Sequence, residues 1–168
     1  VSTADVPSGT GLGSSSSFTV GLLHALYGYQ GECRSKAQLA EEACDVEIRQ
    51  LGAPIGKQDQ YAAAFGGLNY ITFRRNGEVL VEPLIVDRRI LERLQDNLVM
   101  FYTGKRHDAS RILTEQKKNL GSKNKRENLI RMCQLAKDLR YALEHKELQP
   151  FGEILDEGWR RKKEMASS

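Results

Sequence analysis

Apolar side chains recur at three- and four-residue steps along much of this chain, and this spacing predicts helices. A first helix is expected from about residue 16 to residue 28 or 29, on the apolar positions Phe18, Val20, Leu22, Leu23, Leu26 and Tyr27. A second is expected over residues 35–51, with Ser35 as its N-cap and Gly52 and Pro54 ending it. Its apolar side comprises Leu39, Ala43, Val46 and Leu51.

The last part of the chain, from residue 109 onward, also has helical periodicity. Its two apolar stripes are expected to face a core. They consist of Leu129, Met132, Ala136, Leu139 and Leu143, followed by Leu148, Phe151, Leu155 and Trp159.

The middle of the chain carries shorter apolar runs that are typical of strands. Residues 68–74 and 78–84 flank Arg75-Asn76-Gly77, and an Asn-Gly pair between two such runs predicts a hairpin. Further strands are expected over residues 1–6 and 98–103. A strand and loop, a β-rich middle and a helical end together predict an α+β or mixed α/β architecture.

Composition is ordinary for a globular protein, with 168 residues, 40% hydrophobic and 28% charged. Because the chain has no signal-peptide pattern and no apolar run long enough to cross a bilayer, we expect a cytoplasmic location. Cys33, Cys44 and Cys133 are too widely spaced for a metal pair, which predicts reduced, mostly structural thiols. The histidines have no metal-ligand spacing either, so any metal should be bound by oxygen atoms.

The net charge of +3 is too small to argue for a nucleic-acid partner, but it is unevenly distributed. Residues 105–131 hold nine Lys or Arg against three acidic residues. Two interpretations stand for this segment, namely a binding surface for phosphorylated ligands or polyanions and a solvated connection between helices.

Residues 7–17 carry the most specific chemistry, because three alternating glycines lead into four serines and then into the first predicted helix. Glycines allow backbone amides to curl around an anion, and the free amides of a helix N-terminus favour phosphate. Serine hydroxyls can cap the helix, bind phosphate oxygens or reach Mg²⁺. The alternative is a flexible Gly/Ser linker. The predicted nucleotide-binding residues are Pro7, Gly9, Gly11, Leu12, Gly13, Ser14, Ser15, Ser16 and Ser17.

A second candidate site lies in residues 52–67. Glycine and proline surround Lys57, Asp59 and two glutamines there, and such a segment is costly to fold unless it forms a defined surface.

These motifs together resemble those of a known superfamily. Pro7-x-x-x-Gly11-Leu12-Gly13-Ser14-Ser15-Ser16 is similar to the second conserved motif of the GHMP kinases, and residues 52–69, 101–104 and 151–160 resemble the D-glycero-D-manno-heptose 7-phosphate kinase branch. The resemblance implies an α+β fold with a ribosomal protein S5 domain 2-like part. It implies that residues 1–104 belong to the ATP-binding domain and that residues 105–168 begin the helical C-terminal domain. It also implies a central fragment, since the family's first and last motifs are not found.

The resemblance assigns roles to individual residues. Asp59 matches the catalytic aspartate that takes the proton from the sugar hydroxyl, although a loop carboxylate capping the next helix is the alternative. Lys57 is expected to meet negative charge that develops beside it. Glu47 and a serine, Ser15 or Ser16, are expected to bind Mg²⁺, and the alternative for Glu47 is an exposed helix carboxylate.

The implied reaction is ATP- and Mg²⁺-dependent phosphorylation of heptose 7-phosphate at its anomeric hydroxyl. Thr103, Gly104, Lys105 and Arg106 are candidates for contacting the sugar or its distal phosphate. The alternatives are a fucose- or galactose-type acceptor and an inactive module that binds nucleotide or polyanion. The expected partners are therefore a sugar phosphate and ATP, without a membrane or nucleic acid, and the oligomeric state is left open.

Overall fold

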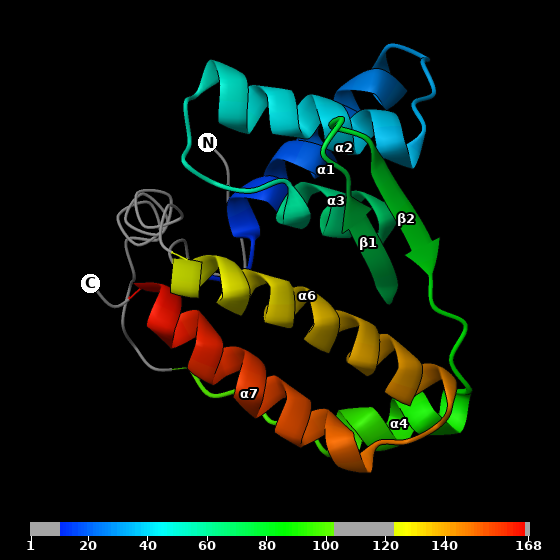
Figure 1. Ribbon diagram of the computed structural model, residues 1–168. Coiled ribbons are helices and arrows are strands. Elements are labelled where there is room, and N and C mark those ends of the chain that lie inside the picture. The colour runs from blue at the N-terminus through cyan, green and yellow to red at the C-terminus, as the bar shows by residue number, and fades with distance from the viewer. Residues whose placement is uncertain (1–10, 103–122, 167–168) are drawn as a thin grey trace. The chain divides into compact units, whose positions relative to one another are not determined.

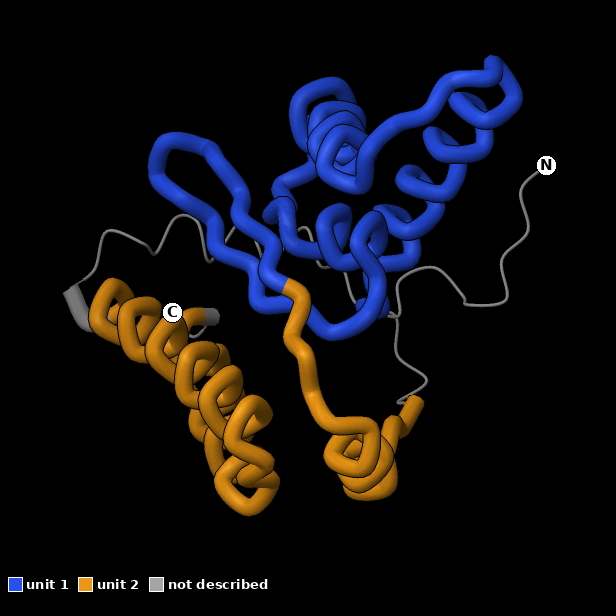
Figure 2. The backbone as a smooth tube through the Cα atoms, turned by 90° about the vertical axis from the view of Figure 1, so that its right-hand side faces the viewer, with its two compact units in different colours: residues 1–82, 103–113 blue, residues 83–102, 114–168 orange. Residues whose placement is uncertain are grey.

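The computed structural model describes residues 11–102 and 123–166, which divide into two compact units (Figures 1 and 2). The first contains the described residues 11–82, and the second contains residues 83–102 and 123–166. Both candidate site segments, as far as they are described, lie in the first unit.

Three α-helices and a short π-helix build most of the first unit. They are α1 (Ser14–Tyr29), α2 (Lys36–Cys44), the π-helix η1 (Asp45–Gln50), which continues α2 directly, and α3 (Gln58–Phe65). A capping box starts α2, because the Gln38 amide donates to Ser35 Oγ at 3.2 Å and the Ser35 amide donates to Gln38 Oε1 at 2.9 Å. Helix α1 packs against α2 and α3, and α2 packs against α3.

A two-stranded hairpin completes this unit. Strands β1 (Asn69–Phe73) and β2 (Val79–Pro83) are joined by a tight turn in which the Gly77 amide donates to the Arg74 carbonyl at 3.0 Å. Gly77 has a φ of 89°, a left-handed conformation that glycine adopts at no steric cost. The predicted hairpin is therefore confirmed.

The core of the first unit lies between α2, α3 and the hairpin. Its buried members are Ala40, Cys44 and Tyr61. The Tyr61 ring stacks on Phe65 and meets Phe73 edge to face. Burying such a side chain stabilises the fold by about 2–3 kcal/mol, and this packing fixes the α3 turn that carries Asp59. Residues packed around this core are Ile48, Ala64, Phe65, Ile71, Val79 and Val81.

The second unit consists of α4 (Arg88–Asp96), α6 (Lys123–Glu144) and α7 (Gln149–Ala166). Helices α6 and α7 form a helical hairpin (Figure 1). Arg131 and Glu157 join these two helices through hydrogen bonds of 3.0 and 3.1 Å. The buried apolar residues of the second unit are Ile90, Leu135, Ala142, Leu143 and Met165.

The structure confirms the two predicted N-terminal helices and the helical character of residues 123–166, and the architecture is α+β. The strand predicted over residues 98–103 is wrong for its described part. Residues 98–102 have no regular structure, because no strand lies beside them among the described residues to complete a ladder. Residues 1–6, 103 and 104 lie outside the described residues.

Several predicted core positions are also wrong. Leu51 is 74% exposed, and Leu155 and Trp159 are 44% and 57% exposed. The buried face of α6 includes the predicted Leu143, together with Leu135 and Ala142, which were not predicted. Helix α4 was not predicted, although Asp87 accepts a hydrogen bond from the Arg89 amide and so caps it. Its short length gives only one buried apolar residue, Ile90, which is too weak a periodic signal to find.

Candidate active site

Helix α1 begins directly after the glycine motif. Its N-cap is Gly13, with a φ of 65°, and no side chain caps it. The first helical hydrogen bond runs from the Ser17 amide to the Gly13 carbonyl at 3.0 Å. The amides of Ser14, Ser15 and Ser16 precede this bond and have no carbonyl partner within the helix. A helix N-terminus of this kind favours an anion, and a capping role for the serines is not observed.

Asp59 lies against this helix start although it is 46 positions away in sequence. A Cβ atom built on Gly13 would be 3.3 Å from Asp59 Cγ and 3.6 Å from Asp59 Oδ2. Asp59 belongs to the first turn of α3, whose N-cap is Lys57. The Asp59 carboxylate therefore lies beside the N-terminus of α1, and Asp59 itself belongs to the N-terminal turn of α3. The alternative of a capping carboxylate is not borne out, because no side chain caps α3.

Glu47 is a buried carboxylate, only 5% exposed, in the π-helix η1. The alternative of an exposed helix carboxylate is therefore wrong. Its Oε2 accepts a hydrogen bond of 2.5 Å from Nε2 of Gln60, which is itself fully buried. The Oε1 atom of Gln60 is buried and has no hydrogen-bond partner among the described residues. Gln60 is one of the two glutamines noted in the second candidate segment, but no role was predicted for it, although it directly follows Asp59.

Lys57 is exposed, and its ammonium group lies near enough to Cys44 to affect that thiol. Burial raises the pKa of Cys44 to about 11, while the charge of Lys57 opposes the shift and that of Glu47 adds to it. Lys57 and Glu47 thus both lie close enough to Cys44 for their charges to act on its thiol. The prediction that Cys44 is a structural thiol agrees with its burial, whereas Cys33 and Cys133 are exposed.

The predicted residues fall into three groups. Asp59 and Gly13 are in contact, and Glu47 and Ser16 are both buried, Ser16 with 1% exposure. Gly11, Leu12, Ser15 and Ser17 are exposed at or just before the start of α1, and Ser14 is half-buried there. Pro7, Gly9, Thr103, Gly104, Lys105 and Arg106 lie outside the described residues, as does most of the basic segment 105–131.

The oxygen donors available here fit Mg²⁺, which takes carboxylate, hydroxyl and water oxygens. Glu47 supplies a buried carboxylate beside the orphaned Gln60 carbonyl, and Ser16 supplies a buried hydroxyl. No cluster of three His, Cys, Asp or Glu side chains suited to a metal occurs among the described residues. A metal held by Glu47 would therefore need oxygen atoms of other kinds.

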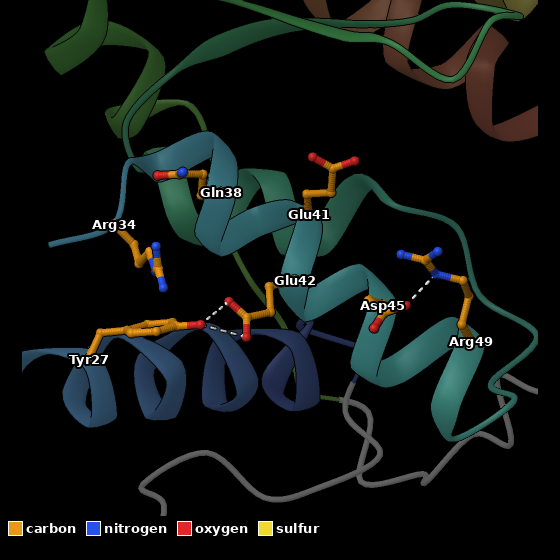
Figure 3. A pocket seen from close by; sticks show the side chains of 7 residues that line it. All are labelled: Tyr27, Arg34, Gln38, Glu41, Glu42, Asp45 and Arg49. Carbon is orange, nitrogen blue, oxygen red and sulfur yellow. Dashed lines mark hydrogen bonds and ion pairs between the residues drawn. The ribbon is translucent and has the colours of Figure 1, made fainter. Parts of the chain in front are cut away.

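A pocket of about 340 Å³ lies elsewhere in the first unit, along α1, α2 and η1 (Figure 3). Its polar groups largely pair with one another. Tyr27 donates to both oxygens of Glu42, the Arg34 guanidinium stacks over the Tyr27 ring, and Asp45 pairs with Arg49. None of the predicted site residues lines this pocket.

Comparison with known proteins relates this geometry to one family. Residues 1–67 match the model of the GHMP kinases N terminal domain. The chain is 34% identical over 160 residues to the D-glycero-alpha-D-manno-heptose 7-phosphate kinase of Campylobacter jejuni, covering 95% of this chain and 47% of that protein. It is also 34% identical over 120 residues to a galactokinase of Pyrococcus furiosus, covering 69% of this chain and 32% of that enzyme.

A solved structure gives the same result. The crystal structure of a D-glycero-D-manno-heptose 1-phosphate kinase from Bacteroides thetaiotaomicron superposes with a TM-score of 0.77 at 33% identity, over 95% of this chain and 46% of that one. The chain thus spans about half the length of these two heptose phosphate kinases and about a third of the galactokinase. No helix among the described residues is long and apolar enough to cross a membrane. The matching N-terminal domain, the relative that is 34% identical over 95% of the chain and the shared fold show that this chain belongs to the GHMP kinase superfamily.

Proposed function

We propose that the protein to which this chain belongs is an ATP-dependent sugar kinase, and that this chain holds its phosphate-binding helix and its proton acceptor. The observation that carries the proposal is the contact between Gly13 and Asp59. Phosphoryl transfer needs an anion cradle beside a group that orients the attacking hydroxyl and takes its proton. The start of α1 and the Asp59 carboxylate provide these two functions at one place.

The proposed reaction transfers the terminal phosphoryl group of ATP to a sugar hydroxyl. The hydroxyl oxygen forms the new P–O bond, the bond between that phosphorus and ADP breaks, and Asp59 takes the proton. The amides of Ser14, Ser15 and Ser16 would bind phosphate oxygens, with Gly11 and Leu12 leading the backbone into this turn. Lys57 would offset negative charge on the transferred group.

Glu47, with the hydroxyl of Ser16 or Ser15, would hold Mg²⁺. The bound ion would neutralise phosphate charge. Support comes from the burial of both Glu47 and Ser16 and from the absence of any basic side chain paired with Glu47 in the described residues.

For the acceptor we propose heptose 7-phosphate, phosphorylated at the anomeric hydroxyl to give the 1,7-bisphosphate. The similarity to a named heptose 7-phosphate kinase over 95% of the chain supports this choice. A related structure is named a heptose 1-phosphate kinase and another relative a galactokinase, so the competing acceptors are heptose 1-phosphate and an unphosphorylated sugar. We further propose the domain division at residues 104 and 105 and a cytoplasmic location, where ATP is available.

The test is a kinase assay on the intact protein. ADP release would be measured with heptose 7-phosphate, heptose 1-phosphate, galactose and fucose, and phosphorus NMR would locate the new phosphate. Asp59→Asn should lower kcat by about 10²–10⁴-fold, because the amide cannot accept the proton, while ATP binding is retained.

Asp45→Asn is the matched control, since Asp45 is an aspartate of the same unit that pairs with Arg49. It should leave kcat unchanged. Equal turnover by Asp59→Asn and the wild type would remove Asp59 from the mechanism. Failure of the intact protein to bind ATP would refute the kinase assignment and favour a polyanion-binding module, whose binding to RNA would weaken steeply with salt.

A further inference from the structure

We propose that Gln60 is a positioning residue that holds the Glu47 carboxylate for a divalent cation, and that the buried Glu47–Gln60 pair is unfavourable to the fold until that cation binds. This inference rests on the proposed function, in which Glu47 binds Mg²⁺, and it assigns a new role to Gln60 and a consequence for stability.

The two side chains come from different elements and are aligned by the core. Glu47 lies in η1 and Gln60 in α3, and the hydrogen bond of 2.5 Å between Gln60 Nε2 and Glu47 Oε2 joins them. Gln60 is fully buried and its neighbour Tyr61 packs in the core. The amide therefore has little freedom to swing away, and it fixes the orientation of the carboxylate plane.

The charge of Glu47 is poorly compensated within the described residues. A buried carboxylate ordinarily pairs with Arg or Lys or accepts several hydrogen bonds. Glu47 is 5% exposed, and its partner is the neutral amide of Gln60. The Lys57 ammonium acts on the nearby Cys44 thiol, yet it forms no ion pair with Glu47. A buried anion in this state disfavours the folded protein.

Gln60 adds a second uncompensated group. Its Oε1 atom is buried and accepts no hydrogen bond from residues 11–102 or 123–166. Reversing the amide would not repair this, because it would turn Oε1 toward the Glu47 carboxylate and place two acceptors face to face. A hydrated cation held by Glu47 would neutralise the carboxylate, and its water ligands could supply an O–H donor for Gln60 Oε1.

The inference predicts an unusual pattern of stability in the intact protein. Glu47→Gln should raise the melting temperature in EDTA, because it removes the buried charge while its amide oxygen can still accept the hydrogen bond from Gln60 Nε2. The same variant should lose the rise in melting temperature that Mg²⁺ gives the wild type. A carboxylate that served only to hold the fold would give the reverse, a lower melting temperature in EDTA.

Two variants test Gln60 itself. Gln60→Met keeps the length of the side chain but removes the amide, and it should shift the Mg²⁺ midpoint at least tenfold upward while Glu47 remains in place. Gln60→Glu puts a second carboxylate beside Glu47, so it should melt lower than the wild type in EDTA and recover as Mg²⁺ is added. Gln58→Met, an exposed position in the same turn of α3, and Glu41→Gln, an exposed position in α2, are the matched controls.

The experiment is differential scanning fluorimetry of all five variants and the wild type over a Mg²⁺ titration, with and without ADP, beside the kinase assay. An unchanged Mg²⁺ midpoint in both Gln60 variants would overturn the positioning role. Should Gln60→Met fail to fold, the Mg²⁺ rescue of Gln60→Glu decides the question. If Mg²⁺ does not change the melting temperature of the wild type but turnover still depends on Asp59, this inference alone is overturned. If Mg²⁺ has no effect on the melting temperature and turnover does not depend on Asp59 either, the kinase proposal is overturned as well.

Discussion

The contact between Gly13 and Asp59 predicts a specific defect in Gly13→Ala. The new methyl group would lie 3.3 Å from Asp59 Cγ and 3.4 Å from Asp59 Cβ, so the carboxylate must give way by a few tenths of an ångström. The backbone adds strain, because Gly13 has a φ of 65° and an L side chain in this region costs about 1–2 kcal/mol. We expect the melting temperature of the intact protein to fall by roughly 2–8 °C.

Turnover should be affected more than this strain explains. Displacing a reacting group by 1 Å can cost about 100-fold in rate, so a shift of a few tenths should lower kcat by about tenfold. Gly31→Ala is the matched control, because Gly31 has a φ of 74° with nothing within 4 Å of its added methyl group. The assay is kcat at saturating ATP and sugar, below the melting temperature of each variant. If Gly13→Ala and Gly31→Ala lose stability alike and both keep full kcat, the contact with Asp59 has no bearing on catalysis.

Three further predictions concern stability and thiol chemistry. Arg131 and Arg161 lower the pKa of Glu157 from 4.5 to about 2, so the stability that this carboxylate contributes is complete above pH 4.5 and is lost as the pH falls toward 2. The melting temperature of Glu157→Gln should therefore change less between pH 4.5 and pH 2 than that of the wild type. Parallel curves for the two proteins would refute a stabilising role for the Glu157 carboxylate. Ser35→Ala removes half of the capping box and should lower the free energy of unfolding, measured in urea, by about 1 kcal/mol. An unchanged free energy of unfolding would show that the Gln38 side chain alone is enough to cap α2. At pH 8 Ellman's reagent should modify Cys33 and Cys133 rapidly and Cys44 only after unfolding, since burial raises the pKa of Cys44 to about 11. Rapid modification of all three cysteines in the folded protein would contradict the burial of Cys44.

Most secondary structure could be predicted because its signals are local. The capping box at Ser35, the Asn-Gly turn and the apolar spacing of α1 each act within a few residues. The strand predicted over residues 98–103 depended on pairing with another segment, and an apolar run contains no information about whether a partner strand exists. Leu155 and Trp159 show the same limitation, because a periodic stripe predicts which residues share a face without determining what covers that face.

The site could be predicted in its parts but not in its geometry. The glycine motif and the Asp59 segment each stood out from composition, and the family resemblance assigned their roles. Their contact follows from the packing of α1 on α3, which brings together residues 46 positions apart. No local pattern encodes that distance. The role of Gln60 was missed for a related reason, since its burial depends on the core around Tyr61 and not on its own chemistry.

Glu47 shows why the pattern of apolar positions fails at this site. The buried residues of α2 and η1 are Leu39, Ala40, Ala43, Cys44 and Glu47, a helical series that ends in a charge. Periodicity predicted Val46 and Leu51 on this face, but Val46 is only half-buried and Leu51 is 74% exposed. A buried carboxylate in a π-helical segment is unfavourable both in solvation and in backbone geometry, and such conflicts persist mainly where function requires them. The disagreement between pattern and structure at this position is therefore itself an argument that Glu47 binds a ligand, and it is independent of the family resemblance.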